Sequence, residues 1–179
     1  MATERQKVQC AGVRVQGTLF LPDPAGAVID DIRRRWDPVM AELVPAHVTV
    51  AYEIDDPAGF SRRLVEVATV MAPLRFALTH AACWGSSPAG GIYLAVDDSF
   101  GDIAGLRRSL RIADPPSVAY TPHVTLVHPR SAHRAEEAWS VLRALRVDQP
   151  VTVHDVALVQ NAGRGWDVVE RVPLLGRRR

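Results

Sequence analysis

The sequence lacks the features that mark membrane, secreted and charge-driven nucleic-acid-binding proteins. No apolar run approaches the roughly 20 residues of a membrane span, and residues 1–7 are polar, without the apolar core of a signal peptide. The 21 basic and 20 acidic side chains leave a net charge of only +1, so bulk charge does not favour non-specific binding to nucleic acid. We therefore expect a cytoplasmic protein with no membrane association, whose contacts with RNA are local.

Cysteine is scarce, and the sequence offers little for a metal ion. Cys10 and Cys83 form no Cys-x-x-Cys motif and are too few for a disulfide framework, so we interpret both as plain thiols. The cluster of His123, His128 and His133 invites a metal hypothesis. However, no cysteine or acidic ligand set lies nearby, and the alternating faces of a strand separate His123 from His128. The sequence thus predicts neither a metal nor a nucleotide cofactor.

A repeated motif is the most informative feature that is present. His47-Val48-Thr49-Val50 recurs 76 positions later as His123-Val124-Thr125-Leu126. The β-branched residues predict a short strand at each copy, in which His and Thr point to one face and the valine between them to the other. Each copy therefore presents an imidazole beside a hydroxyl. Two copies suggest one site built by two halves of the chain.

Strand and helix patterns follow one another in a parallel order around the two motifs. Further strands are expected at 17–21, 76–84, 92–96, 151–159 and 166–172, and helices at 23–36, 56–71, 100–110 and 135–145. Asp37-Pro38 and Asp114-Pro115-Pro116 are expected to interrupt helices, and Trp36, Trp84 and Trp139 fit core positions. Each motif strand is followed by a helix and two strands, which is the order that a pseudo-two-fold arrangement of lobes needs.

The chain resembles the 2H phosphoesterases and, within them, the 2',5'-RNA ligase-like branch. The resemblance rests on the paired His-x-Thr-x motifs, on Trp84-Gly85 and the strand Ile92–Val96 between them, and on the closing segments Ala157–Val159 and Val172–Leu174. It implies an α+β fold of two pseudo-symmetric αβ lobes, each with an antiparallel sheet and helices packed outside, enclosing a central groove. We expect residues 1–179 to form one bilobal domain, with 176–179 as a flexible basic tail.

The resemblance also implies metal-independent chemistry on 2',3'-cyclic phosphates or related nucleotide phosphodiesters, with both motif histidines catalytic. Opening a cyclic phosphodiester needs a base and an acid on opposite sides of phosphorus. An imidazole, with an unperturbed pKa of about 6.5, can serve in either role, so one of His47 and His123 starts neutral and the other protonated. Thr49 and Thr125 are candidates to hold the non-bridging phosphate oxygens. Which histidine is the base stays open at this point.

Three further residues are candidates for substrate binding. His128 lies five residues after His123, where related sequences often carry an arginine near the phosphate; an exposed histidine at the end of a strand is the alternative interpretation. Tyr52 lies five residues after His47 and is either a base-stacking residue or a packing residue at the rim. Arg130 is either a phosphate contact or a solvated side chain.

We predict a phosphoesterase that opens a cyclic phosphodiester of an RNA end or a nucleotide, acting in RNA processing as a monomer without an obligate protein partner. Two alternatives stay open: a non-catalytic module that binds RNA or nucleotides, and a 2',5'-RNA ligase. Both motifs are complete, which favours an enzyme over a binding module. A protein that joins RNA ends would be expected to carry a wider basic surface than this near-neutral chain supplies.

Overall fold

The computed structural model describes residues 13–113, 119–161, 163 and 165–177. The elements in chain order are β1 (Arg14–Phe20), α1 (Ala25–Trp36), α2 (Pro38–Leu43), β2 (His47–Ala51), α3 (Pro57–Ala68), β3 (Leu74–Cys83), η1 (Pro88–Gly90), β4 (Ile92–Asp97), α4 (Asp102–Ser109), β5 (His123–Val127), η2 (Pro129–Arg134), α5 (Ala135–Leu142), β6 (Arg146–Val153), β7 (Asp155–Asn161) and β8 (Trp166–Pro173). Cys10, the break at Asp114-Pro115-Pro116 and the last two arginines of the expected tail lie outside the described residues.

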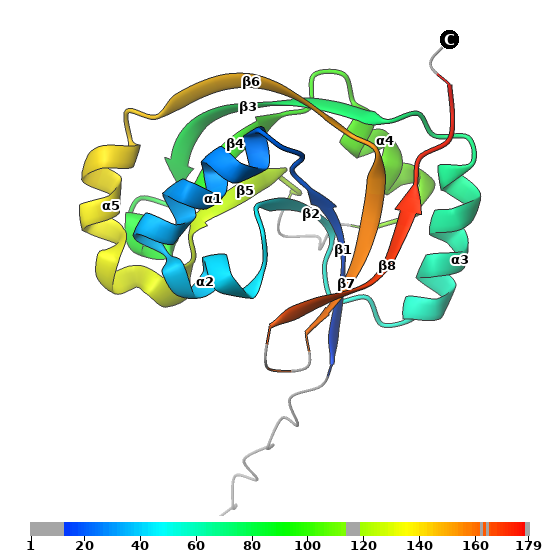
Figure 1. The fold of residues 1–179 in the computed structure, drawn as a ribbon, viewed down its shortest axis with the longest axis horizontal. Helices are drawn as coiled ribbons and strands as arrows, with labels where there is room; N and C mark the ends of the chain where they lie inside the picture. The colour runs from blue at the N-terminus through cyan, green and yellow to red at the C-terminus, as the bar shows by residue number, and fades with distance from the viewer. Residues whose placement is uncertain (1–12, 114–118, 162, 164, 178–179) are drawn as a thin grey trace, which may run out of the picture.

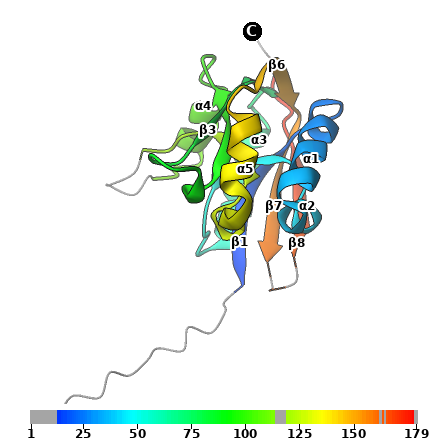
Figure 2. The ribbon, with the colours of Figure 1, turned by 90° about the vertical axis from the view of Figure 1, so that its left-hand side faces the viewer.

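The eight strands form one antiparallel sheet in the order β6-β3-β4-β5-β2-β1-β7-β8. The two motif strands, β2 and β5, lie side by side in the middle, with three further strands beyond each. The sheet curves strongly, with α1, α2 and α5 toward one end and α3 and α4 toward the other (Figure 1). The side view shows α5 near the middle, with α1 and α2 to its right (Figure 2). The α+β class expected from the sequence is confirmed, and the antiparallel sheets expected for two lobes are the two halves of one continuous eight-stranded sheet.

Strands are exchanged between the two halves of the sheet. β3 follows the first motif and its helix but pairs with β4, in the half that contains β5. β7 follows the second motif and its helix but pairs with β1, in the half that contains β2. The half with β5 therefore includes β3 and β4, which follow the first motif, and the half with β2 includes β7 and β8, which follow the second.

One expected strand proved to be two. The run from 151 to 159 is divided at His154 into β6, which pairs with β3 at one edge of the sheet, and β7, which pairs with β1 in the other half. The sequence shows no turn signal here because the chain continues across the curved sheet and changes neighbours without reversing. Only long-range pairing reveals the division.

The expected helices are confirmed, with corrections at two of them. Asp37 does not only end α1: it also caps the unexpected helix α2, its carboxylate accepting from the Met40 backbone N–H at 3.4 Å. An aspartate before a proline is as good a helix start as a helix stop. In α4, Phe100 precedes the helix and is exposed, and the buried stripe instead includes Leu106.

The core lies behind the motif strands. Val48, Val50, Val124 and Leu126 are buried, whereas His47 and His123 on the opposite face keep some exposure. The alternation predicted for the two motifs is therefore the one observed. No helix in the described ranges is both long and apolar enough to cross a membrane.

Candidate active site

The two motifs meet on one face of the sheet. β2 and β5 are antiparallel, with Val48 paired to Val124. In that register His47 comes level with Thr125, and Thr49 with His123, so each histidine lies diagonally across the seam from the other. All four side chains line one cavity of about 450 Å³. The four residues singled out from the sequence are thus brought together at the junction of the two halves.

Both imidazoles are held in the same way. The Nδ1 of His47 donates to the carbonyl oxygen of Pro45 at 2.7 Å, and the Nδ1 of His123 donates to the carbonyl oxygen of Thr121 at 2.8 Å. A carbonyl can only accept, so Nδ1 carries the proton in each ring. This leaves Nε2 of each histidine available to a substrate, as an acceptor when the ring is neutral and as a donor when it is charged.

The protein lowers the pKa of both histidines. Burial lowers the pKa of His47 to about 4, against the opposing hydrogen bond to Pro45 and with a further contribution from the positive charge of Arg33. Burial also lowers the pKa of His123, against the hydrogen bond to Thr121. Both imidazoles are therefore mostly neutral at pH 7 in the free protein, and a bound phosphate anion would favour their protonated forms.

The surroundings of the two histidines differ. The ring centroids of Trp84 and Tyr93 lie 4.9 Å and 5.5 Å from that of His123, both edge-on. His47 has the ring of Phe20 at 6.1 Å. The two histidines are therefore alike in their motif residues but differ in their aromatic neighbours.

The tryptophans were only partly placed from the sequence. Trp36 is buried and Trp139 is partly buried, as expected for core positions. Trp84 is not a core residue: 38% of its surface is exposed, and it lines the cavity. Trp166, the first residue of the strand expected at 166–172, also lines the cavity, with the guanidinium of Arg14 over its ring at 5.6 Å. Helical and strand periodicity cannot distinguish a core tryptophan from one that faces a cavity.

The three candidate substrate residues occupy different positions. Tyr52 and His128 line the cavity, whereas Arg130 is exposed outside it. Burial raises the pKa of the Tyr52 phenol, which also hydrogen-bonds the side chain of Thr49. The Nδ1 of His128 accepts from the backbone N–H of Arg130 at 3.1 Å, and burial lowers the pKa of His128. Arg130 thus contributes a backbone contact to this region.

Asp37 is a residue of the site that the sequence analysis missed. Its carboxylate is buried and accepts from the backbone N–H of His128 and from the hydroxyl of Ser131, both at 2.7 Å. These bonds tie the junction of α1 and α2 to the segment that follows β5, and Asp37 itself lines the cavity. Its place before a proline indicated only a helix boundary.

Two buried arginines also support the site. Arg33 lines the cavity, pairs with Asp30 at 2.5 Å and donates to the carbonyl oxygen of Met40 at 3.1 Å. Arg107 donates to the carbonyl oxygen of Val50 and lies 3.6 Å from the centre of the Tyr120 ring.

Their sequence signal was an interrupted apolar stripe. Arg33 falls four residues after Ile29, and Arg107 four residues after Ile103, so each arginine occupies a core position of its helix. The Tyr120 hydroxyl, held beside Arg107, donates to the backbone carbonyl of Thr49 at 3.0 Å.

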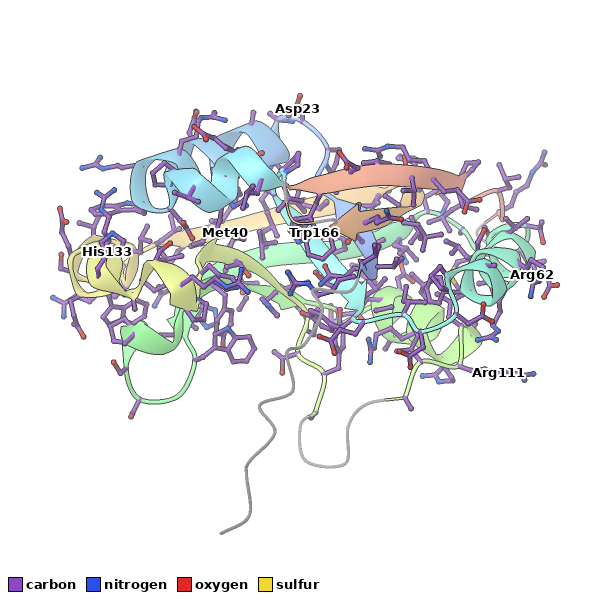
Figure 3. The ribbon with its side chains drawn as sticks, turned by 90° about the horizontal axis from the view of Figure 1, so that it is seen from below. Asp23, Met40, Arg62, Arg111, His133 and Trp166 are labelled. Carbon is purple, nitrogen blue, oxygen red and sulfur yellow. The ribbon has the colours of Figure 1, made fainter. Side chains whose placement is uncertain are left out.

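Possible metal ligands are dispersed. Among the residues with described positions, no three His, Cys, Asp or Glu side chains are grouped so as to hold a metal ion. His133, one of the three histidines considered for a metal site, lies at the edge of the molecule seen from below. The cavity residues Met40 and Trp166 lie near its middle (Figure 3).

Comparisons with known proteins agree with this architecture. The model of the 2'-5' RNA ligase superfamily matches residues 21–165. No curated protein sequence matches the chain. Among solved structures, the protein TT0787 of Thermus thermophilus is 17% identical, with a TM-score of 0.62, over 92% of this chain and 100% of that one.

Two further structures share the fold. LigT of E. coli, solved with 3'-AMP, is 16% identical, with a TM-score of 0.53, over 90% of this chain and 97% of its own. Usb1 of Kluyveromyces marxianus is 14% identical, with a TM-score of 0.50, over 90% and 98%. At these identities the likeness is one of fold.

Proposed function

This chain belongs to the 2'-5' RNA ligase superfamily of 2H phosphoesterases, and from that premise we propose that it is a metal-independent cyclic phosphodiesterase. Its substrate in this proposal is a 2',3'-cyclic phosphate, or a related cyclic phosphodiester, of a nucleotide or an RNA end. The observation that carries the proposal is the meeting of two His-Thr pairs across one cavity.

The electrostatics of the cavity favour His47 as the base in hydrolysis. A pKa of about 4 keeps this imidazole neutral, and the neighbouring Arg33 acts in the same direction. In the proposed reaction Nε2 of His47 takes a proton from water as the new P–O bond forms. His123, protonated in the presence of the phosphate anion, gives its Nε2 proton to the ribose oxygen as the old P–O bond breaks.

The two threonines are suited to the charge on the phosphate. Thr49 and Thr125 each lie beside a histidine, and a hydroxyl can donate to a non-bridging oxygen as negative charge grows in the transition state. The hydroxyl of Thr49 is oriented by Tyr52, and its backbone carbonyl by Tyr120. These contacts hold Thr49 in place before the substrate arrives.

The relatives support a nucleotide as the substrate. LigT of E. coli has been solved with 3'-AMP, with ATP and with NADP+. A protein of the same fold thus accepts ligands that combine a nucleoside with phosphate, and we propose the same class of ligand for this cavity.

The test is turnover of a panel of 2',3'-cyclic nucleotides and short RNAs ending in cyclic phosphate, with EDTA present. We expect hydrolysis to survive EDTA, and His47→Ala and His123→Ala each to lower kcat by about 100-fold or more while circular dichroism shows an intact fold. The matched control is His133→Ala, since His133 is exposed and lies outside the cavity.

Two results would contradict the proposal. One is full turnover by either motif variant, which would remove that histidine from the mechanism. The other is binding of these ligands without any turnover, which is the behaviour of a non-catalytic module.

A further inference from the structure

The wall of the cavity beside His123 contains a stacked aromatic pair. The indole of Trp84 lies against the ring of Tyr93, with centroids 4.4 Å apart and planes inclined by 31°. The same indole meets His123 at 86°, edge to face. Tyr93 therefore supports Trp84 on one side, while the indole remains 38% exposed and lines the cavity. An apolar ring left open beside catalytic groups is a surface prepared for a ligand.

The backbone around Trp84 and Tyr93 is tied to the second motif. The backbone N–H of Trp84 donates to the backbone carbonyl oxygen of Gly91 at 3.1 Å, and this bond closes the loop between β3 and β4. A Cβ at Gly90 would lie only 2.7 Å from the Trp84 carbonyl oxygen, so the loop packs too closely there for a side chain. Tyr93 pairs with Thr125 in the sheet. The aromatic pair is thus held before any ligand binds, which lowers the entropy cost of stacking.

The lining beside His47 has a different character. Arg33 acts electrostatically on His47 and donates to the carbonyl oxygen of Met40, so this part of the lining includes a charged and an aliphatic side chain. A flat, uncharged face next to a phosphate site suits a nucleobase, because every base has a π-face that stacks on an aromatic ring. We propose that Trp84 stacks the nucleobase of the substrate, so that the nucleoside lies on the His123 side of the scissile phosphate. This inference rests on the proposed function.

Three other aromatic residues line the cavity: Tyr52, Tyr120 and Trp166. The ring of Tyr120 lies against the guanidinium of Arg107 and its hydroxyl donates to the Thr49 carbonyl, so Tyr52 and Trp166 are the competing positions for the base. The hydroxyl of Tyr52 is bonded to Thr49, and the ring of Trp166 is covered in part by Arg14. Among the described residues, neither ring contacts a motif histidine, whereas Trp84 does. Trp166 is therefore the matched control: it is the same residue type, in the same cavity, without the contact to His123.

The first measurement is equilibrium binding, by calorimetry, of adenosine 3'-phosphate and of ribose 3-phosphate, which lacks the base. Stacking of a base is worth about 1–3 kcal/mol, so we expect Trp84→Ala to raise the Kd of adenosine 3'-phosphate by about 5- to 150-fold. The Kd of ribose 3-phosphate should change much less. Trp84→Phe should restore most of the affinity, and Trp166→Ala should not reproduce the loss.

The second measurement is turnover of 2',3'-cyclic AMP compared with the 2,3-cyclic phosphate of 1-O-methylribose. In Trp84→Ala we expect the kcat/KM ratio of the nucleotide over the base-free ester to fall by the same factor, mainly through KM. Equal losses for both substrates would overturn the inference, because Trp84 would then act only through His123. A loss reproduced by Trp166→Ala would overturn it as well.

The two experiments separate this inference from the proposed function. If the wild-type protein hydrolyses neither cyclic ester, the proposed function fails. Loss of base-selective binding in Trp84→Ala would still support the stacking position in that case. If hydrolysis is robust and Trp84→Ala binds both ligands as the wild type does, the stacking position is wrong and the proposed function stands.

Discussion

The pH dependence of turnover follows from two histidines whose pKa values the fold lowers. In the proposed reaction His47 is the base and must be neutral, so kcat/KM should rise with pH through about 4. As the acid, His123 must be protonated, so kcat/KM should fall as pH rises past its pKa, which lies below 6.5. The optimum for the free enzyme is therefore expected between about pH 4 and 6.5. Two unperturbed imidazoles would instead place it near neutrality.

The size of the effect can be bounded. If the pKa of His123 is at most 6.5, no more than about one molecule in ten carries the acid proton at pH 7.5, and each further pH unit removes another factor of ten. At pH 8.5 kcat/KM should lie about 100-fold or more below its maximum. Bound phosphate stabilises the protonated imidazole, so the alkaline limb of kcat should lie at higher pH than that of kcat/KM.

The assay is initial-rate hydrolysis of 2',3'-cyclic AMP from pH 3.5 to 9 at constant ionic strength, with circular dichroism at both extremes to check the fold. The two limbs report the coupled pair of histidines rather than either one alone. A flat profile from pH 5 to 9 would refute the acid-base reasoning. An optimum of kcat/KM above pH 7.5 would refute the assignment of burial as the main influence on these groups.

Two further predictions concern stability. Because burial lowers the pKa of His47 from 6.5 to about 4, the unfolded chain binds this proton more tightly, and the stability present above pH 6.5 is lost as pH falls toward 4. Acidification from pH 7 to 4 should thus lower the free energy of unfolding by up to about 3 kcal/mol more in the wild type than in His47→Gln, measured in urea; equal slopes would remove His47 as the cause. Asp37→Ala should lower it by roughly 2–5 kcal/mol, since the His128 N–H and the Ser131 hydroxyl lose their acceptor. Exposed Asp31→Ala should cost no more than about 0.5 kcal/mol, and an equal loss in both variants would contradict the role of Asp37.

Local patterns predicted the parts of the site that lie on single strands. The alternation of His47, Val48 and Thr49 determines which side chains share a face, because a strand has a period of two wherever it pairs. Helix α3 was equally predictable: Asp56 caps it by accepting from the Gly59 N–H at 2.9 Å. These features depend on neighbours within a few positions.

Other features depend on which distant segments meet. The exchange of β3 and β7 between the halves, and the change of neighbours at His154, follow from pairing across the sheet, which no local pattern encodes. Asp37 became part of the site only because His128 and Ser131 packed against it, from segments more than 90 positions away.

The amino-acid sequence by itself determined the chemistry of the site, namely two imidazoles and two hydroxyls on the same face of two short strands. The tertiary structure decided that those strands lie side by side, that Trp84 faces the cavity beside His123, and that burial, with the charge of Arg33, lowers the pKa of His47 to about 4. The physical reason is that backbone geometry sets the direction of a side chain locally. Its solvation, charge environment and partners are set by segments far away in the chain.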